Sequence, residues 1–224
     1  MNRENDVLGN AQFGTSAIEV NKVLRNTYAL LAMTLVSSGI MATISSALNM
    51  PSFTYLVCIG IAMALMFFVM PKVANSSKGI AMVFVITGLL GFGIGPLLNH
   101  YMALQNGGQL IATSLGGTGV IFLALSAYAL TSKRDFSFMG GMLMVGFMVA
   151  IGLSLVNLFL QIPAMSLMLS AFVILIMSGF ILFDTSRIVN GGERNYIMAT
   201  IGLYMTIFNI FINLLALLGF SSDD

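Results

Sequence analysis

The segment FMGGMLMVGFMVAIGLSLVNLFL, residues 138–160, decides the fold, because no charged side chain interrupts it. About 20 predominantly apolar residues make a helix long enough to cross the roughly 30 Å hydrocarbon core of a bilayer. Other segments of the chain have the same length and character. The predicted spans are Tyr28–Ala47, Phe53–Met70, Gly79–Asn99, Leu110–Leu130, Phe138–Leu160, Ala164–Phe183 and Ile197–Leu218.

The composition also indicates that lipid surrounds this chain. Hydrophobic residues make up 58% of it and charged residues 8%, and its mean hydropathy is +0.98, whereas a soluble domain carries about 25% charged residues. Unpaired backbone groups are costly in lipid, so the spans must be helices. The breaks at Met50-Pro51 and Ile162-Pro163 are so brief that the flanking helices must form tight antiparallel hairpins. We therefore predict an all-α membrane protein, a seven-helix transmembrane bundle.

Every Lys and Arg lies on one side of the predicted spans: Arg3, Lys22, Arg25, Lys72, Lys78, Lys133, Arg134, Arg187 and Arg194. The positive-inside rule therefore places the N-terminus in the cytoplasm and, after seven crossings, the C-terminus in the periplasm. Residues 1–27 are predicted to be a polar cytoplasmic tail, either disordered or a handle for a soluble partner. Residues 28–218 are the predicted transmembrane domain, and residues 219–224 a short acidic periplasmic tail.

The sequence offers little for catalysis or metal binding. Cys58 and His100 are the only residues of their kinds, which is too few for a zinc site of the usual type. No nucleotide-binding loop of the Gly-x-x-x-x-Gly-Lys type occurs, and a net charge of +1 gives no reason to expect nucleic acid as a partner. We predict a protein that is not an enzyme, without catalytic, cofactor-binding or metal-binding residues.

Asp184 is the ionisable side chain that comes closest to membrane depth, at the end of the sixth predicted span. Ionisable groups within the membrane are costly and usually functional. Arg187 follows three residues later on the same helical face, where it can pair with Asp184. Two interpretations stay open: a snorkelling interfacial ion pair, or a proton-sensing or ion-gating site.

The last predicted span carries a stripe of small and polar residues. Gly202, Thr206, Asn209 and Asn213 recur there at helical spacing. Such a stripe avoids lipid and faces other helices or a wet cavity, where the two asparagines are expected to find interhelical partners. The stripe is either a packing contact or the lining of a permeation or sensing path.

The third predicted span contains features of close helix packing. Gly91 and Gly95 form a Gly-x-x-x-Gly face, which lets another helix approach closely. Pro96 removes a helical hydrogen bond and should kink or end the helix near the outer surface.

Several runs of the sequence match a known family. The chain resembles the transmembrane Bax inhibitor motif family in Gly95-Pro96-Leu97-Leu98, Phe183-Asp184-Thr185-Ser186, Leu203-Tyr204 and Asn209-Ile210-Phe211. Longer runs are similar to a bacterial branch of that family, the modulators of FtsH protease: Lys22-Val23-Leu24-Arg25-Asn26-Thr27-Tyr28, Phe138-Met139-Gly140-Gly141-Met142-Leu143-Met144 and Gly191-Gly192-Glu193-Arg194-Asn195-Tyr196-Ile197. The resemblance covers the chain from about Lys22 onward.

The resemblance implies a fold in which the last helix is central and wrapped by the other six, and a location in the bacterial inner membrane. It also implies two candidate activities. One is binding to the membrane-anchored protease FtsH, with restraint of its degradation of membrane substrates. The other is a pH-sensitive calcium or cation leak, gated by two aspartates that share a proton.

This sequence departs from the aspartate pair of that resemblance. Asp184 matches the first aspartate, but the second position falls on Thr206, which cannot ionise. Two carboxylates in one site couple strongly, and a single one has no such coupling. We therefore predict an FtsH modulator embedded in the lipid bilayer. The alternative is a cation leak channel or transporter for calcium or protons, whose path would use Asp184, Arg187, Thr206, Asn209 and Asn213.

Overall fold

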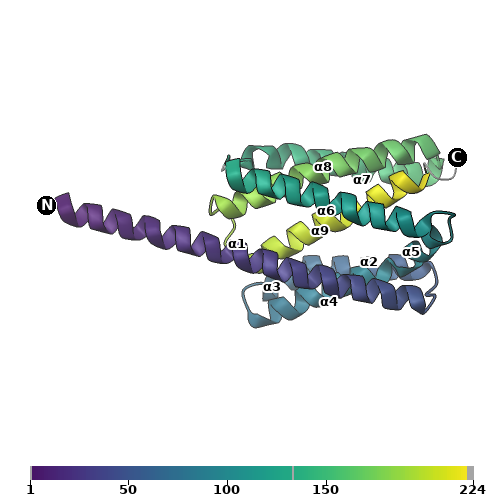
Figure 1. Ribbon diagram of the computed structural model, residues 1–224, viewed down its shortest axis with the longest axis horizontal. Helices are drawn as coiled ribbons and strands as arrows, with labels where there is room; N and C mark the ends of the chain where they lie inside the picture. Colours follow the sequence, from purple (N-terminus) through teal and green to yellow (C-terminus); the bar gives the residue numbers. More distant parts are fainter. Residues whose placement is uncertain (1, 133, 221–224) are drawn as a thin grey trace.

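The computed structural model describes residues 2–132 and 134–220, with side chains described from Ile18 onward. The elements in chain order are α1 (Asn2–Ala47), α2 (Phe53–Ala64), the π-helix η1 (Leu65–Val69), α3 (Met70–Val73), α4 (Ser77–Gly93), α5 (Gly95–Met102), α6 (Gly107–Ser132), the 3-10 helix η2 (Ser137–Met139), α7 (Gly140–Leu160), α8 (Pro163–Val189) and α9 (Tyr196–Phe220) (Figure 1).

The described residues contain 7 helical stretches that are long and apolar enough to cross a membrane, which confirms the predicted fold class. The stretches are Ile18–Ala47, Phe53–Val73, Ser77–Met102, Gly107–Ser132, Ser137–Leu160, Pro163–Val189 and Tyr196–Phe220.

Residues of α1 that precede the predicted first span, which began at Tyr28, also pack into the bundle. Val23 and Leu24 pack against the core, and Thr27 is completely buried, so this part of α1 belongs to the bundle. The sequence suggested a later start because Lys22 and Arg25 interrupt the apolar run. Both side chains are exposed, and long basic side chains can reach the polar interface from within a helix end.

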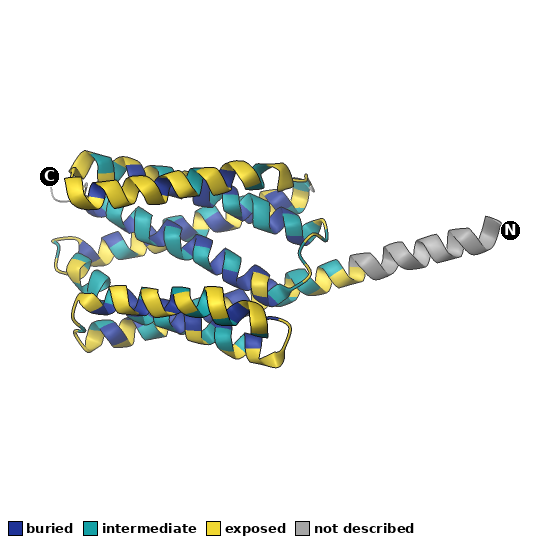
Figure 2. Cartoon of the chain, turned by 180° about the vertical axis from the view of Figure 1, so that it is seen from behind, coloured by how far each residue is buried: buried dark blue, intermediate teal, exposed yellow. Residues whose placement is uncertain are grey.

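Helix α9 lies at the centre of the bundle, as predicted. It packs directly against α1, α4, α6 and α8, while α2 packs on α4 and α7 packs on α8. In Figure 1, α9 crosses diagonally between a group that contains α1 to α4 and a group that contains α7 and α8. Its side chains Leu203, Tyr204, Ile210 and Leu215 are almost entirely buried, and Figure 2 shows the buried residues facing inward between these groups.

Two prolines interrupt the helices of the first half. Pro71 lacks an N–H and its ring crowds the carbonyl of the preceding turn, and the π-helical segment Leu65–Val69 lies directly before it. Pro96 stands in the first turn of α5, and α4 ends at Gly93 just before it. The break between α4 and α5 is therefore located where Pro96 cannot supply a helical hydrogen bond.

The hairpins between α1 and α2 and between α7 and α8 each turn at a residue with positive φ. Asn49 has a φ of 49° and Gln161 a φ of 51°. Asn157, in the last turn of α7, supports the second hairpin: its amide oxygen accepts from the Ile162 N–H at 3.1 Å, and its amide nitrogen donates to the Ser166 hydroxyl at 2.7 Å.

Glycines on α4 and α5 allow α1 to approach closely. A Cβ at Gly91 would overlap the backbone carbonyl of Ser38, and a Cβ at Gly95 would overlap Ser45. Both overlaps involve backbone or short side-chain atoms of α1, which have little freedom to move. The glycine face recognised in the sequence is therefore the contact surface between α1 and the α4–α5 segment.

A buried hydrogen-bond network joins α9 to two other helices. The hydroxyl of Tyr204 lies 2.5 Å from the hydroxyl of Ser38 on α1 and donates to the Thr87 carbonyl on α4 at 3.2 Å. All three residues are buried. Since no water competes within the membrane, this network fixes α9 against α1 and α4.

We expect Gly91→Ala to lower the free energy of unfolding by about 1–3 kcal/mol, because the added methyl group forces α1 away from α4. Thermal unfolding in a mild detergent measures the loss. Gly60→Ala is the matched control, since a Cβ at Gly60 on α2 meets no atom within 4 Å. Equal unfolding temperatures for the two variants would contradict the close packing at Gly91.

Removal of the Tyr204 hydroxyl tests the network separately. Tyr204→Phe should lower the free energy of unfolding by about 1 kcal/mol, the usual scale for hydrogen bonds between membrane helices. Tyr128→Phe serves as the control, because Tyr128 is 46% exposed and its hydroxyl has no hydrogen bond with any described residue. If Tyr204→Phe behaves like the control, the network does not stabilise the bundle.

Candidate functional site

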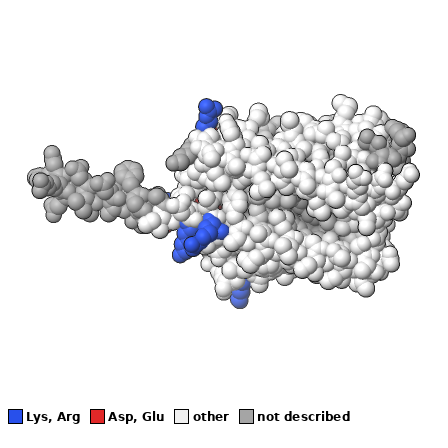
Figure 3. All heavy atoms as spheres, in the orientation of Figure 1, with Lys and Arg blue, Asp and Glu red and all other residues white. Residues whose placement is uncertain are grey.

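The basic residues of the described chain gather at one end of the bundle, which we call the basic end. It comprises the start of the first span, the α3–α4 connection, the segment after α6 and the α8–α9 loop. On the face shown in Figure 3, the Lys and Arg side chains lie at the end from which α1 projects. Side-chain hydrogen bonds join the α8–α9 loop to the α3–α4 connection, and the end of α8 to the segment after α6.

Asp184 lies near the end of α8 and faces α9. Its carboxylate oxygen Oδ2 is 3.4 Å from the position that a Cβ would take at Gly202. Among the described residues, none makes a hydrogen bond or ion pair with Asp184. Gly202 therefore gives α9 the room to pass beside this carboxylate, and Thr206, the predicted second position, lies one turn further along α9.

Arg187 pairs with Glu193 rather than with Asp184. The guanidinium nitrogen lies 3.3 Å from Glu193 Oε2, and the guanidinium carbon lies 5.4 Å from the centroid of the Phe183 ring. The predicted pairing with Asp184 rested on helical spacing alone. The α8–α9 loop instead returns a second carboxylate, Glu193, to the last turn of α8.

The α8–α9 loop has a defined backbone. Gly191 has a φ of +74°, a conformation that favours glycine. The N–H groups of Gly192 and Glu193 both donate to the Arg187 carbonyl, at 2.8 and 3.0 Å. The Glu193 carboxylate also accepts from the Asn195 N–H at 2.9 Å. This loop therefore ties the end of α8 to the start of α9.

Asn195 is a site residue that the sequence interpretation missed. Its amide oxygen accepts from the N–H groups of Ile197 and Met198, at 2.9 and 3.2 Å, and so caps the start of α9. Its amide nitrogen donates to the Ala74 carbonyl at 3.0 Å and to the Asn75 side chain at 2.8 Å. The available signal was an asparagine two residues before the last predicted span, because asparagine is a preferred residue at the start of a helix.

Ser186 was also missed, and it connects α8 to the segment after α6. Its hydroxyl donates to the Arg134 carbonyl at 3.1 Å and accepts from the Phe136 N–H at 2.9 Å and from the Asn190 side chain at 3.2 Å. A serine in an apolar helix end gives no sequence signal for such long-range partners.

The polar stripe of α9 bonds to its own helix. Thr206 donates to the Gly202 carbonyl at 3.1 Å, Asn209 to Met205 at 2.8 Å, and Asn213 to Asn209 at 2.8 Å. This corrects the expectation of interhelical partners for the two asparagines. In lipid, the carbonyl one turn earlier is always within reach of such a side chain, so a helix can satisfy these groups alone.

Within the described ranges, no group of three or more His, Cys, Asp or Glu side chains is arranged to hold a metal ion. Cys58 is buried in α2, and His100 is exposed in α5.

Comparisons with known proteins match nearly the whole chain. A family model described as inhibitor of apoptosis-promoting Bax1 matches residues 20–223. The modulator of FtsH protease YccA of Escherichia coli (strain K12) is 49% identical over 210 residues, which cover 94% of this chain and 95% of the relative. The inner membrane protein YccA of Escherichia coli O6:H1 has the same identity and coverage. An uncharacterized membrane protein of Vibrio cholerae is 49% identical over 207 residues, 92% of this chain and 93% of the relative.

Asn195→Ala should lower the free energy of unfolding by about 1–2 kcal/mol, because it removes the cap of α9 together with the link to the α3–α4 connection. Hydrogen exchange at the first turn of α9 should rise in the same variant. Asn21→Ala is a suitable control, since Asn21 is exposed and makes no hydrogen bond with the described residues. Unchanged exchange at Ile197 and Met198 would show that the cap is not needed.

Proposed function

This chain belongs to the family described as inhibitor of apoptosis-promoting Bax1, and on that basis we propose that it modulates the protease FtsH. It is an integral inner-membrane protein, given its 7 membrane-spanning helices and its likeness to an inner-membrane relative. The proposed activity is binding to FtsH and restraint of the degradation of membrane substrates. The observation that carries the proposal is the 49% identity to the modulator of FtsH protease YccA across 94% of this chain.

The proposed role is that of a binding protein and not of an enzyme. The names of the family and of the relative describe an inhibitor and a modulator. The bonds made by Arg187, Glu193 and Asn195 support a structural role for the polar side chains at the basic end, because they hold helices and loops together.

The contacts around Asp184 favour the modulator over the cation leak. A carboxylate pair that shares a proton requires a second acid beside the first. The α9 residue beside Asp184 is Gly202, and the Thr206 hydroxyl is bonded to its own helix. The stripe residues Asn209 and Asn213 are likewise bonded within α9, which supports packing rather than the lining of a path.

The N-terminal part of α1 is the proposed contact region for the protease. The helix has 46 residues, and at about 1.5 Å per residue such a helix is more than twice as long as the roughly 30 Å hydrocarbon core. Figure 1 shows α1 extending past the other helices at the basic end. With the basic end in the cytoplasm, as the positive-inside rule predicts, this part of α1 lies on the side of a cytoplasmic protease domain.

Reconstitution of FtsH with a membrane substrate tests the proposal. Adding the full chain should slow degradation of the membrane substrate, while degradation of a soluble substrate by the same FtsH continues at its usual rate. A chain that lacks residues 2–17 should fail to co-purify with FtsH and should lose the restraint. Removal of residues 221–224 is the matched truncation at the other terminus and should have no effect. Degradation that is equally fast with and without the full chain contradicts the proposal.

The same vesicles, loaded with a calcium-sensitive dye, discriminate the alternative. We expect no pH-dependent calcium flux, and we expect Asp184→Asn to leave the restraint of FtsH unchanged. A strong flux that rises and falls with pH and disappears in Asp184→Asn would favour the cation leak.

A further inference from the structure

Two hollows open at the basic end, on either side of Arg194 and Tyr196. The first has a volume of about 420 Å³ and lies between α1 and the α8–α9 loop. The second has a volume of about 560 Å³ and lies between the α3–α4 connection and the start of α9. Both fall within the range of about 300–1,000 Å³ that ligand sites occupy.

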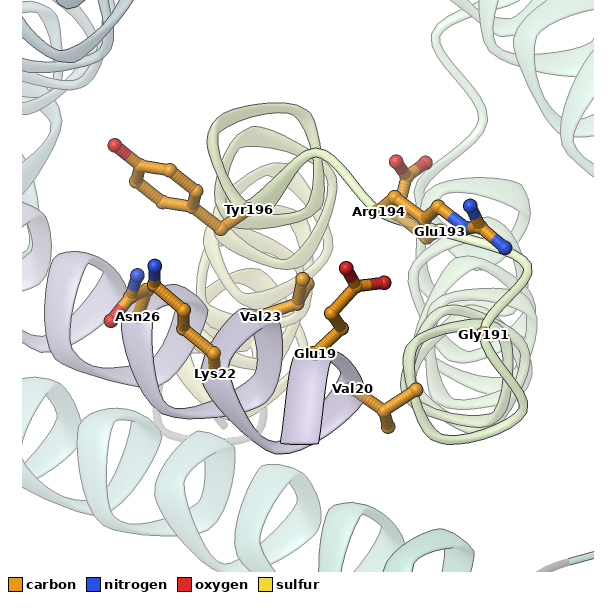
Figure 4. Close-up of a pocket in the computed structure, with 9 residues that line it drawn as sticks. All are labelled: Glu19, Val20, Lys22, Val23, Asn26, Gly191, Glu193, Arg194 and Tyr196. Atoms are coloured by element: carbon orange, nitrogen blue, oxygen red, sulfur yellow. The ribbon is translucent and has the colours of Figure 1, made fainter. Parts of the chain in front are cut away.

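The first hollow has mixed charge. Glu19 and Lys22 line it from α1, and Glu193 and Arg194 line it from the loop (Figure 4). Glu193 is already paired with Arg187. Two carboxylates and two cations leave this hollow without a net preference for an anion.

The second hollow differs because Arg194 is its only charged lining residue. No described residue makes an ion pair or hydrogen bond with the Arg194 guanidinium. The hollow also contains Asn75 and Ser77. The Asn75 amide oxygen accepts from Asn195, which leaves the amide N–H₂ to donate, and the Ser77 hydroxyl has no partner within the described chain. One cation and neutral donors therefore line the second hollow and no carboxylate lines it, although Arg194 stands on its border with the first hollow.

The second hollow lies where two membrane spans begin. Ser77 is the first residue of α4, and Tyr196 is the first residue of α9. Ile80 and Ile197 line the same hollow within the first turn of these helices, beside the polar groups. Tyrosine is enriched at the level of lipid headgroups, and Lys72 and Lys78 flank the α3–α4 connection. This arrangement places donors at headgroup level and apolar side chains at the start of the hydrocarbon region.

We propose that the second hollow binds the phosphate group of an anionic phospholipid. Arg194 supplies the charge, in the forked geometry that suits phosphate oxygens, and Asn75 and Ser77 supply neutral donors. Ile80, which is partly exposed, contacts the first carbons of an acyl chain. The binding is independent of the proposed action on FtsH, because it uses the α3–α4 connection and not the N-terminal part of α1.

Lipid titration of the purified, delipidated full chain in a mild nonionic detergent tests this site. Phosphatidylglycerol should bind and raise the unfolding temperature, whereas phosphatidylcholine and sodium phosphate should not. Native mass spectrometry measures the bound lipid. Arg194→Gln should weaken phosphatidylglycerol binding about fivefold, the effect of one surface cation on an anionic lipid. Ser77→Ala should weaken it less, and Arg194→Lys, which keeps the charge but loses the fork, should bind more weakly than the unsubstituted chain and more tightly than Arg194→Gln.

Arg25→Gln is the matched control. Arg25 is an exposed cation at the same end that lines neither hollow, and its loss should leave lipid binding unchanged. Equal weakening by Arg25→Gln and Arg194→Gln would overturn the proposal, because it would indicate attraction to the whole basic end. Sodium phosphate that binds as tightly as the lipid would overturn the lipid assignment. If Arg194→Gln does not fold, the comparison of the other two variants decides the question. Ser77→Ala should weaken phosphatidylglycerol binding more than Arg25→Gln does, and the reverse would overturn the proposal.

Discussion

In the core of a bilayer no water is available to bond a polar group, so a polar group without a partner in the protein is costly there. The central helix α9 shows how this chain meets that constraint. Thr206, Asn209 and Asn213 donate to carbonyls of their own helix, while the Tyr204 hydroxyl reaches Ser38 and Thr87 on two neighbouring helices. Polar residues at the centre of the bundle can therefore contribute to its cohesion without lining a wet path.

The same requirement organises the basic end, where the helices stop and backbone groups lose their helical partners. Asn195 caps α9 and bonds to the α3–α4 connection, and Ser186 bonds to the segment that follows α6. The Glu193 carboxylate joins Arg187 to the Asn195 N–H across the α8–α9 loop. These bonds give the end a defined surface, with Arg194 on the border between the two hollows.

Asp184 shows why residue type alone does not decide function. The sequence allows either an interfacial ion pair or a pH-sensing site. In the structure its neighbour on α9 is Gly202, and the nearby cation Arg187 is held by Glu193. Gly202 and Thr206 give α9 no second acid with which Asp184 could share a proton, so the proposed function rests on binding to a protease and not on the titration of this residue.

The sequence alone determined the number of spans, their approximate limits and the family, because the bilayer imposes a length and an apolar composition that each segment must meet independently. It also identified Gly91 and Gly95 as a packing face. Only the tertiary structure decided which atoms meet at that face and that Arg187 pairs with Glu193. It also decided that the α9 asparagines bond to their own helix. Asn195 bonds to the α3–α4 connection and Ser186 to the segment after α6, and these contacts too appear only in the structure. Those partners are brought together by loop closure and by the packing of helices far apart in the chain, and neither periodicity nor composition encodes such contacts.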